Sequence, residues 1–218
     1  MSDFSPSDHN AANELSSVVL VVDDDPSMRS ALDNLFSSVG LKVKTFECAT
    51  RLLAIDFPDV ATCMVLDVRM PGLGGLELQA KLANANIHVP VIIMTSHGDI
   101  PMTVKAMKAG AVDFLSKPFR DQDMLDAVAA ALDRDRERRG IERSRVELRT
   151  LFESLTPSER KVMSLVSSGM MNKSVAAEIG LKEITVKVNR GKVMRKMHAT
   201  SLADLVRMAE TLGIASRR

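Results

Sequence analysis

The chain is poor in cysteine and in aromatic residues, and it has no long apolar run. Of its 218 residues two are Cys, and none is Trp or Tyr. Cys48 and Cys63 have neither the spacing of a zinc site nor enough partners for a disulfide framework, which indicates a reducing cytoplasm. The apolar run 18–22 is far shorter than the ~20 residues of a membrane span. We expect the polar residues 1–16 to be a flexible tail without the apolar core of a signal peptide.

Charge divides the chain into two halves. Residues 1–132 carry 10 Lys and Arg against 17 Asp and Glu, a net charge of −7. Residues 133–218 carry 19 against 11, a net charge of +8. Two halves of opposite charge indicate two units with different partners, and the basic half is suited to nucleic acid. A basic, solvated helical face would give the same count.

Short apolar runs alternate with helical patterns in the acidic half. Most runs lack polar alternation, which is typical of strands buried on both faces. The expected strands are 18–22, 41–45, 62–67, 91–95 and 112–116. Cys63, inside one of them, is expected to be a buried small hydrophobe. The pattern predicts an α/β doubly wound, five-stranded parallel sheet with helices on both faces.

The sequence of the basic half predicts helices throughout. A dense run of mixed charge lies between residues 120 and 155 and predicts one long final helix of the first unit, followed by a connector in which Gly140 is a candidate break. Thr156 precedes a Pro and is followed by an early acid, which is typical of a helix start. Gly180 separates a short helix from two further helices at about 183–198 and 201–213. The second unit is therefore predicted to be an all-α, four-helix, helix-turn-helix domain.

Carboxylates gather at the predicted strand ends. The first strand is followed by Asp23 and Asp24, and the third ends in Asp67. Thr95 ends the fourth strand, and Lys117 follows the fifth. In a parallel sheet these ends lie on one edge, where functional sites form. Carboxylates this close repel one another unless a hard cation such as Mg²⁺ neutralises them, and an adjacent Lys and Thr suit a phosphoryl group.

Four motifs in the acidic half closely resemble the receiver domain of bacterial two-component response regulators. They are VVDDD (21–25), MVLDVRMPGLGGLEL (64–78), VIIMTSHGD (91–99) and DFLSKPF (113–119). The resemblance implies that Asp67 is the phosphoacceptor of a sensor histidine kinase. It implies that Asp23, Asp24, Asp67 and the backbone carbonyl of Arg69 hold Mg²⁺. Thr95 and Lys117 would contact the phosphoryl group, and Thr95 and Phe114 would act as switch residues. We also expect a cis Lys117–Pro118 bond, because the family turns sharply here.

Each of these residues also has an ordinary structural explanation. An acidic run after a strand often only complements a helix dipole, and Phe114 is as well suited to core packing as to switching. Aspartyl-phosphate hydrolases also use a strand-end Asp, but many carry a second carboxylate two residues later, where this chain has Arg69. The sequence therefore favours phosphoryl acceptance over turnover, and no enzyme is predicted.

The basic half closely resembles the DNA-binding module of the LuxR/NarL/FixJ class, the FixJ-like branch most. The resemblance covers about 150–215 and implies that helix 183–198 enters the DNA major groove. Val186, Val193 and Met197 should pack inward. By analogy with the family, Lys187, Val188 and Gly191 lie nearest the base edges. The other expected DNA contacts are Asn172, Lys173, Thr185, Arg190, Lys192 and Arg195.

Together these features predict a phosphorylation-controlled transcription regulator. The expected domains are a tail (1–16), a receiver (17–133), a helical linker (134–150) and a DNA-binding domain (151–218). Expected partners are a sensor histidine kinase, double-stranded DNA, a second copy on phosphorylation and RNA polymerase, and no membrane. Two alternatives stay open: a phosphoryl-handling enzyme or adaptor whose C-terminal module binds protein, and a constitutive regulator that never uses its phosphate site.

Overall fold

The computed structural model describes residues 17–96 and 99–214. The chain divides into two compact units, Met1–Arg139 and Gly140–Arg218. The expected tail lies outside the described residues. The expected domain boundaries at residues 133 and 150 both fall inside one helix and stay predictions. Within the described ranges, no helix combines the length and apolar character that a membrane crossing requires.

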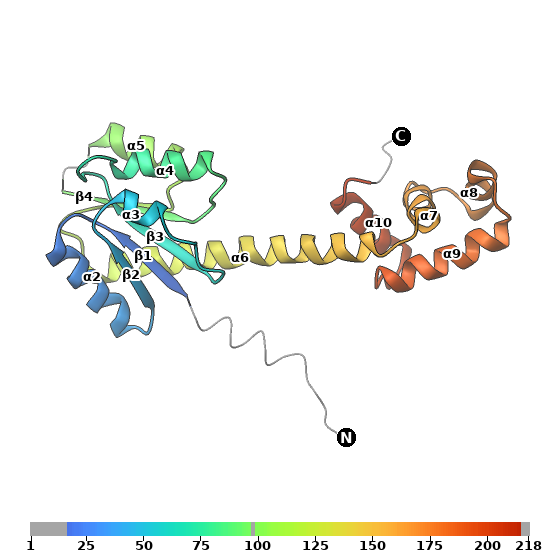
Figure 1. Ribbon diagram of the computed structural model, residues 1–218, viewed down its shortest axis with the longest axis horizontal. Coiled ribbons are helices and arrows are strands. Elements are labelled where there is room, and N and C mark those ends of the chain that lie inside the picture. Colours follow the sequence, from blue (N-terminus) through green and yellow to red (C-terminus); the bar gives the residue numbers. More distant parts are fainter. Residues whose placement is uncertain (1–16, 97–98, 215–218) are drawn as a thin grey trace, which may run out of the picture. The chain divides into compact units, whose positions relative to one another are not determined.

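The first unit alternates strands and helices, and the second is helical (Figure 1). The first unit contains β1 (Val18–Val22), α2 (Pro26–Ser38), β2 (Lys42–Phe46), α3 (Ala49–Leu53), β3 (Thr62–Asp67), α4 (Gly75–Asn84), β4 (Val91–Thr95), α5 (Ile100–Lys108) and β5 (Asp113–Ser116). Helix α6 (Asp121–Glu153) follows, and then come α7 (Pro157–Ser167), α8 (Asn172–Ile179), α9 (Glu183–Lys196) and α10 (Leu202–Thr211).

The five strands form one parallel sheet in the order β2-β1-β3-β4-β5. This confirms the predicted fold class. β1, β3 and β4 begin and end at the expected residues, because each is rich in apolar residues, buried along its whole length and in the middle of the sheet. β2 lies at an edge, is largely exposed and begins one residue later than expected.

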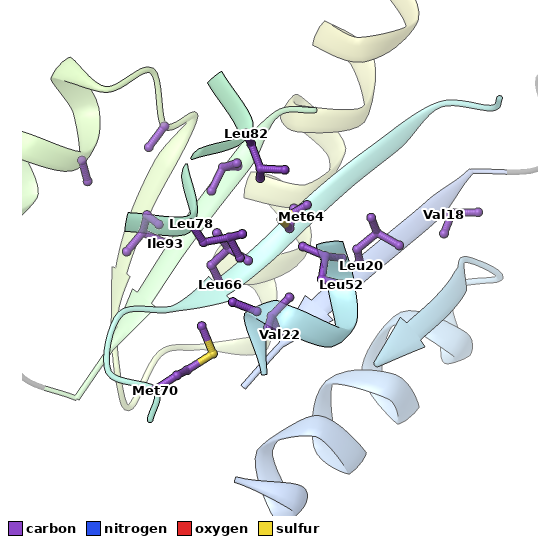
Figure 2. Close-up of a cluster of buried hydrophobic side chains, with 14 residues drawn as sticks. Val18, Leu20, Val22, Leu52, Met64, Leu66, Met70, Leu78, Leu82 and Ile93 are labelled. Atoms are coloured by element: carbon purple, nitrogen blue, oxygen red, sulfur yellow. The ribbon is translucent and has the colours of Figure 1, made fainter. Parts of the chain in front are cut away.

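Alternate residues of each central strand enter two different cores. Val18, Leu20 and Val22 of β1 face α3, α4 and α5, and Figure 2 shows this cluster. Val19 and Val21 face α2 and α6. Cys63 joins the second cluster and is fully buried, as expected. Because the side-chain period of a strand is two, both faces of the sheet must be apolar, and this explains the absence of polar alternation.

Helix α6 continues through Gly140, so the expected break is wrong. A glycine inside a helix costs only about 1 kcal/mol relative to Ala. Charged pairs one turn apart support the helix on either side, including Arg136 with Asp133 and Arg149 with Glu153. The mixed charge of this segment therefore stabilises a continuous helix of 33 residues.

A buried carboxylate ties α6 to the start of β3. Asp135 is fully buried and accepts a hydrogen bond of 3.0 Å from the backbone N–H of Thr62. Arg138 and Arg139 both donate to it, at 2.7 Å at their shortest. Arg139 also donates to the carboxylate of Asp59. The charge of Asp135 is thus compensated on several sides, as a buried charge requires.

The second unit contains the predicted helix-turn-helix. Thr156 caps α7, and its side chain and that of Glu159 form a reciprocal capping box. α8 and α9 are joined through Gly180, which has a positive φ of 66°. A left-handed backbone of this kind favours glycine.

Three α9 side chains pack inward as predicted: Val186, Val193 and Met197 are all fully buried. They divide between two small cores. Val193 and Met197 pack with residues of α6, α7 and α10, whereas Val186 packs with residues of α7 and α8. Burying one face of α9 in this way leaves the opposite face exposed.

Candidate functional site

Three carboxylates meet at the carboxyl edge of the sheet. Asp23 follows β1, and Asp67 ends β3, which is its neighbour in the sheet. One carboxylate oxygen from each of Asp23, Asp24 and Asp67 lies within 4.8 Å of the others. Asp23 and Asp67 are buried and Asp24 is exposed. The structure therefore brings together the acidic residues that the sequence had singled out.

Lys117 supplies the opposite charge. Its Nζ lies 2.7 Å from Oδ2 of Asp23 and 3.4 Å from Oδ1 of Asp67. The backbone N–H of Lys117 donates to the carbonyl of Thr95 over 2.7 Å, which joins the ends of β4 and β5. The Lys117–Pro118 bond is cis, as predicted. One cation facing several acids leaves the cluster with excess negative charge.

Burial raises the pKa of the Asp67 carboxyl above its ordinary value. Lys117 acts in the opposite direction and stabilises the ionised form, whereas Asp23 and Asp24 again raise the pKa by repulsion. A cation close to the three carboxylates would relieve this repulsion, and oxygen donors are the ligands that Mg²⁺ prefers. The donor set thus fits a hard divalent cation.

The remaining expected receiver residues lie on β4, on β5 and in the segment after β3. Thr95 is fully buried at the end of β4. Phe114 is half-buried and packs against the cluster of Figure 2. Arg69 is exposed, two residues after Asp67. Asp25, in contrast, caps α2 by accepting a hydrogen bond of 2.8 Å from the N–H of Ser27, which gives it a structural role that Asp24 lacks.

Gly75 is a functional candidate that the sequence analysis did not single out. It begins α4, and its N–H donates to the carbonyl of Val68 over 3.1 Å. A Cβ at this position would lie 2.3 Å from the backbone oxygen of Asp67. The start of α4 therefore packs directly against the backbone of Asp67. A pair of glycines at 74–75 was the available signal, but it looked like an ordinary turn.

The expected DNA-contacting residues lie on α8 and on the exposed surface of α9. Lys187, Val188, Gly191, Lys192 and Arg195 are exposed, as are Thr185 and Lys173. Arg190 is half-buried, and its guanidinium donates to Oδ1 of Asn172 over 3.4 Å, so these two expected contacts are linked across the helix-turn-helix. Ile184, 64% exposed on α9, was not singled out from the sequence.

Two family models cover most of the chain. Residues 19–129 match the response regulator receiver domain, and residues 153–209 match the luxR family of bacterial regulatory proteins. This chain belongs to the response regulators with a LuxR-type DNA-binding domain. The family consists of transcription regulators controlled by phosphorylation, not enzymes, so the alternative of a hydrolase is excluded.

Relatives of this response regulator align over nearly its whole length. Nodulation protein W of Bradyrhizobium diazoefficiens is 62% identical over 91% of this chain and 88% of that protein. Transcriptional regulatory protein FixJ of Azorhizobium caulinodans is 44% identical over 90% of this chain and 93% of that protein. The structure of response regulator StyR, 47% identical, has a TM-score of 0.81 and covers 89% of this chain and 98% of that one. A sensor kinase partner and DNA binding follow from the two domains.

Proposed function

We propose that Asp67 is the residue that accepts the phosphoryl group. The observation that carries the proposal is the position of its carboxylate, 3.4 Å from the Lys117 ammonium and beside two further carboxylates. In the transfer, an Asp67 oxygen attacks the phosphorus of a phosphohistidine on the sensor kinase. The new O–P bond forms as the P–N bond breaks, and the imidazole nitrogen that leaves retains the bonding electron pair.

Asp23, Asp24, Asp67 and the backbone carbonyl of Arg69 would hold Mg²⁺ in this site. When bound, the ion would supply positive charge to the phosphoryl oxygens. Lys117, already 2.7 Å from Asp23, would turn toward the same oxygens. The hydroxyl of Thr95 would hydrogen-bond the phosphoryl group, and Phe114 would repack when Thr95 moves.

Labelling with acetyl phosphate in Mg²⁺ tests the assignment. Asp67→Asn should abolish incorporation, measured by intact mass, since the chain has no Trp for fluorescence. Asp25→Asn is the matched control, because Asp25 is an adjacent acid that caps α2. Normal labelling of Asp67→Asn would refute the assignment. A wild-type chain that accepts phosphate from no donor would instead favour the constitutive regulator.

For DNA binding, the exposed face of α9 is the proposed reading surface. Lys187, Val188 and Gly191 would contact base edges in the major groove, and Arg195 would contact phosphates. Lys187→Ala should change sequence preference, by about 1–3 kcal/mol for a lost base contact. Arg195→Ala should weaken binding to specific and random DNA alike and reduce the salt slope by about one. Equal losses on both DNAs for Lys187→Ala would contradict the first assignment.

We further propose that the phosphorylated protein acts as a homodimer in the cytoplasm, contacting RNA polymerase at its target promoters. An exposed apolar stripe on α5 supports a contact between two copies. Ile100, Val104 and Met107 are 81%, 45% and 44% exposed and recur at the spacing of one helical face. A second copy presenting the same stripe would bury all three side chains, which is the form of a two-fold contact.

A further inference from the structure

A single arginine binds the main chain of the acidic turn that follows β1. Arg29 lies in α2, and its Nη1 donates to the carbonyl of Asp23 over 2.7 Å and to that of Asp24 over 3.0 Å. Its own backbone N–H donates to the carbonyl of Asp25 over 3.1 Å. One residue therefore donates to three consecutive carbonyls, those of the turn 23–25. Two of these three residues are acids proposed to bind Mg²⁺.

The two carbonyls that the guanidinium contacts lie between the sheet and the helix. The paired residues of β1 end at Val22, and α2 begins at Pro26 with Asp25 as its N-cap. A helical N–H is available to the carbonyl of the N-cap, but not to the carbonyls before it. Asp23 is only 1% exposed, and a buried main-chain oxygen requires a donor. The side chain of Arg29 supplies this donor.

Arg29 reaches the turn because of its place in the helix. It is the fourth residue of α2, and helical side chains lean toward the N-terminus, so a long side chain here extends back over the first turn. The carboxylate of Asp23 is also held by the backbone N–H of Asp25 at 2.8 Å and by Lys117 at 2.7 Å. Asp24 is exposed, and the bond at its carbonyl fixes the main chain from which its carboxylate projects.

A guanidinium beside these acids has two opposite effects on a bound cation. Its charge repels Mg²⁺, but Arg29 is only half-buried, so water and salt screen this repulsion. Its hydrogen bonds hold two metal ligands in place, and loss of an outer group that orients ligands typically weakens metal binding about 10–100-fold. Both acceptors are carbonyls, so these bonds do not compete with the cation for a carboxylate oxygen. The orienting effect should therefore exceed the repulsion.

We propose that Arg29 is a positioning residue for the metal site of the receiver. It holds the turn 23–25 so that Asp23 and Asp24 meet Asp67 at one cation, and it acts through these ligands without contacting the ion. The inference rests on the proposed Mg²⁺ site and adds to it a residue from outside the carboxylate cluster. The affinity for Mg²⁺ would then depend on a side chain of α2 as well as on the ends of β1 and β3.

Titration of the full-length, unphosphorylated chain with magnesium chloride, followed by amide NMR shifts, tests this inference. Arg29→Met removes the donors and the charge and keeps an unbranched side chain. We expect the dissociation constant for Mg²⁺ to rise at least about tenfold. Charge alone predicts the opposite sign, since removing a positive charge beside the site should tighten the binding of a cation. Unchanged or tighter binding by Arg29→Met would overturn the inference.

Arg134→Met is the matched control. Arg134 is exposed and lines the same cavity as Val91, the first residue of β4, so it lies toward the end of the sheet that does not carry the carboxylates. This variant should bind Mg²⁺ as the wild type does, and an equal loss in both variants would count against a specific role of Arg29. Each titration is made well below the Tm that the variant has in EDTA, so that a lost fold cannot imitate a lost site.

A second variant and the wild type complete the experiment. If Arg29→Met fails to fold, Arg29→Lys decides: it keeps the charge, but its shorter side chain stops short of the place of Nη1, so Mg²⁺ binding as tight as that of the wild type would overturn the inference. A wild-type chain that binds no Mg²⁺ would refute the metal site itself, and the role of Arg29 with it. A wild type and an Arg29→Met variant that bind Mg²⁺ equally well would refute the role of Arg29 alone.

Discussion

Replacing Gly191 with Ala should stabilise the protein and weaken its binding to DNA. Gly191 lies in the interior of α9 and is exposed, and apart from its chain neighbours and its own helix backbone no atom lies within 4 Å of where a Cβ would stand. Nothing inside the protein therefore requires glycine here. The substitution should gain about 0.8–1 kcal/mol of helix stability, which corresponds to about 4–8 °C in Tm for a domain of this size. If the DNA approaches α9 at this position, the added methyl group must displace it.

The expected loss of affinity on a specific site is about 1–3 kcal/mol, the range for one base contact. Stability would be followed by circular dichroism and affinity by anisotropy on labelled duplexes. Gly140→Ala is a matched control, since Gly140 is also exposed inside a helix with open space around it. That variant should be stabilised with unchanged DNA affinity. An unchanged DNA affinity of Gly191→Ala would refute the proposal that DNA contacts α9 at this position. A lower Tm would refute the expectation that a Cβ fits here without a clash.

Three other substitutions have defined outcomes. Gly75→Ala, whose Cβ would lie 2.3 Å from the backbone oxygen of Asp67, should destabilise the receiver by about 1–3 kcal/mol and slow acetyl phosphate labelling; an unchanged labelling rate would contradict this. A hydrogen bond from the ammonium of Lys196, 2.7 Å away, lowers the pKa of the Glu159 carboxyl. The ionised carboxylate therefore stabilises the folded protein above the pKa of a Glu in the unfolded chain, ~4.3. This stabilisation is lost as the pH falls through the lower pKa of the folded state. Glu159→Gln should therefore cost about 1–3 kcal/mol at neutral pH and little in acid, and denaturant curves showing a loss independent of pH would be inconsistent with it. Val104→Asp should lower the dimer fraction of the phosphorylated protein in sedimentation and leave labelling intact. Val39→Asp, at a comparably exposed apolar site at the end of α2, should change neither. Dimers retained by Val104→Asp would exclude the α5 stripe as the dimer contact.

Much of the receiver could be predicted because its signals are local. The buried strands are short segments rich in apolar residues, and the bounds of β1, β3 and β4 were predicted to the residue. Parallel strands place their carboxyl ends on one edge, and this sufficed to bring Asp67 and Lys117 together without any knowledge of distances.

The features that were missed depend on contacts between distant segments. Asp135 was one charge among many in a run of mixed charge, and no sequence signal indicated its contact with Thr62, 73 residues earlier, which accompanies its burial. Gly75 looked like part of a turn, because its close approach to Asp67 exists only when α4 packs beside β3. The break expected at Gly140 failed for the opposite reason. A single helix-weakening residue was given more weight than the charged pairs on both sides of it.

Strand β3 is held at its first residue and along both neighbouring strands, which limits how a change at its carboxyl end can spread. Its first residue donates to the buried Asp135, and its last residue is Asp67. Sliding of β3 along the sheet would break its hydrogen bonds to β1 and β4 and the bond from Thr62 together. A phosphoryl group on Asp67, as proposed above, would therefore leave the strand in place and act on residues 68–74, which follow it. The hydrogen bond from the N–H of Gly75 to the carbonyl of Val68 connects the residues after β3 to α4. We therefore expect α4 to move first and β3 to move least.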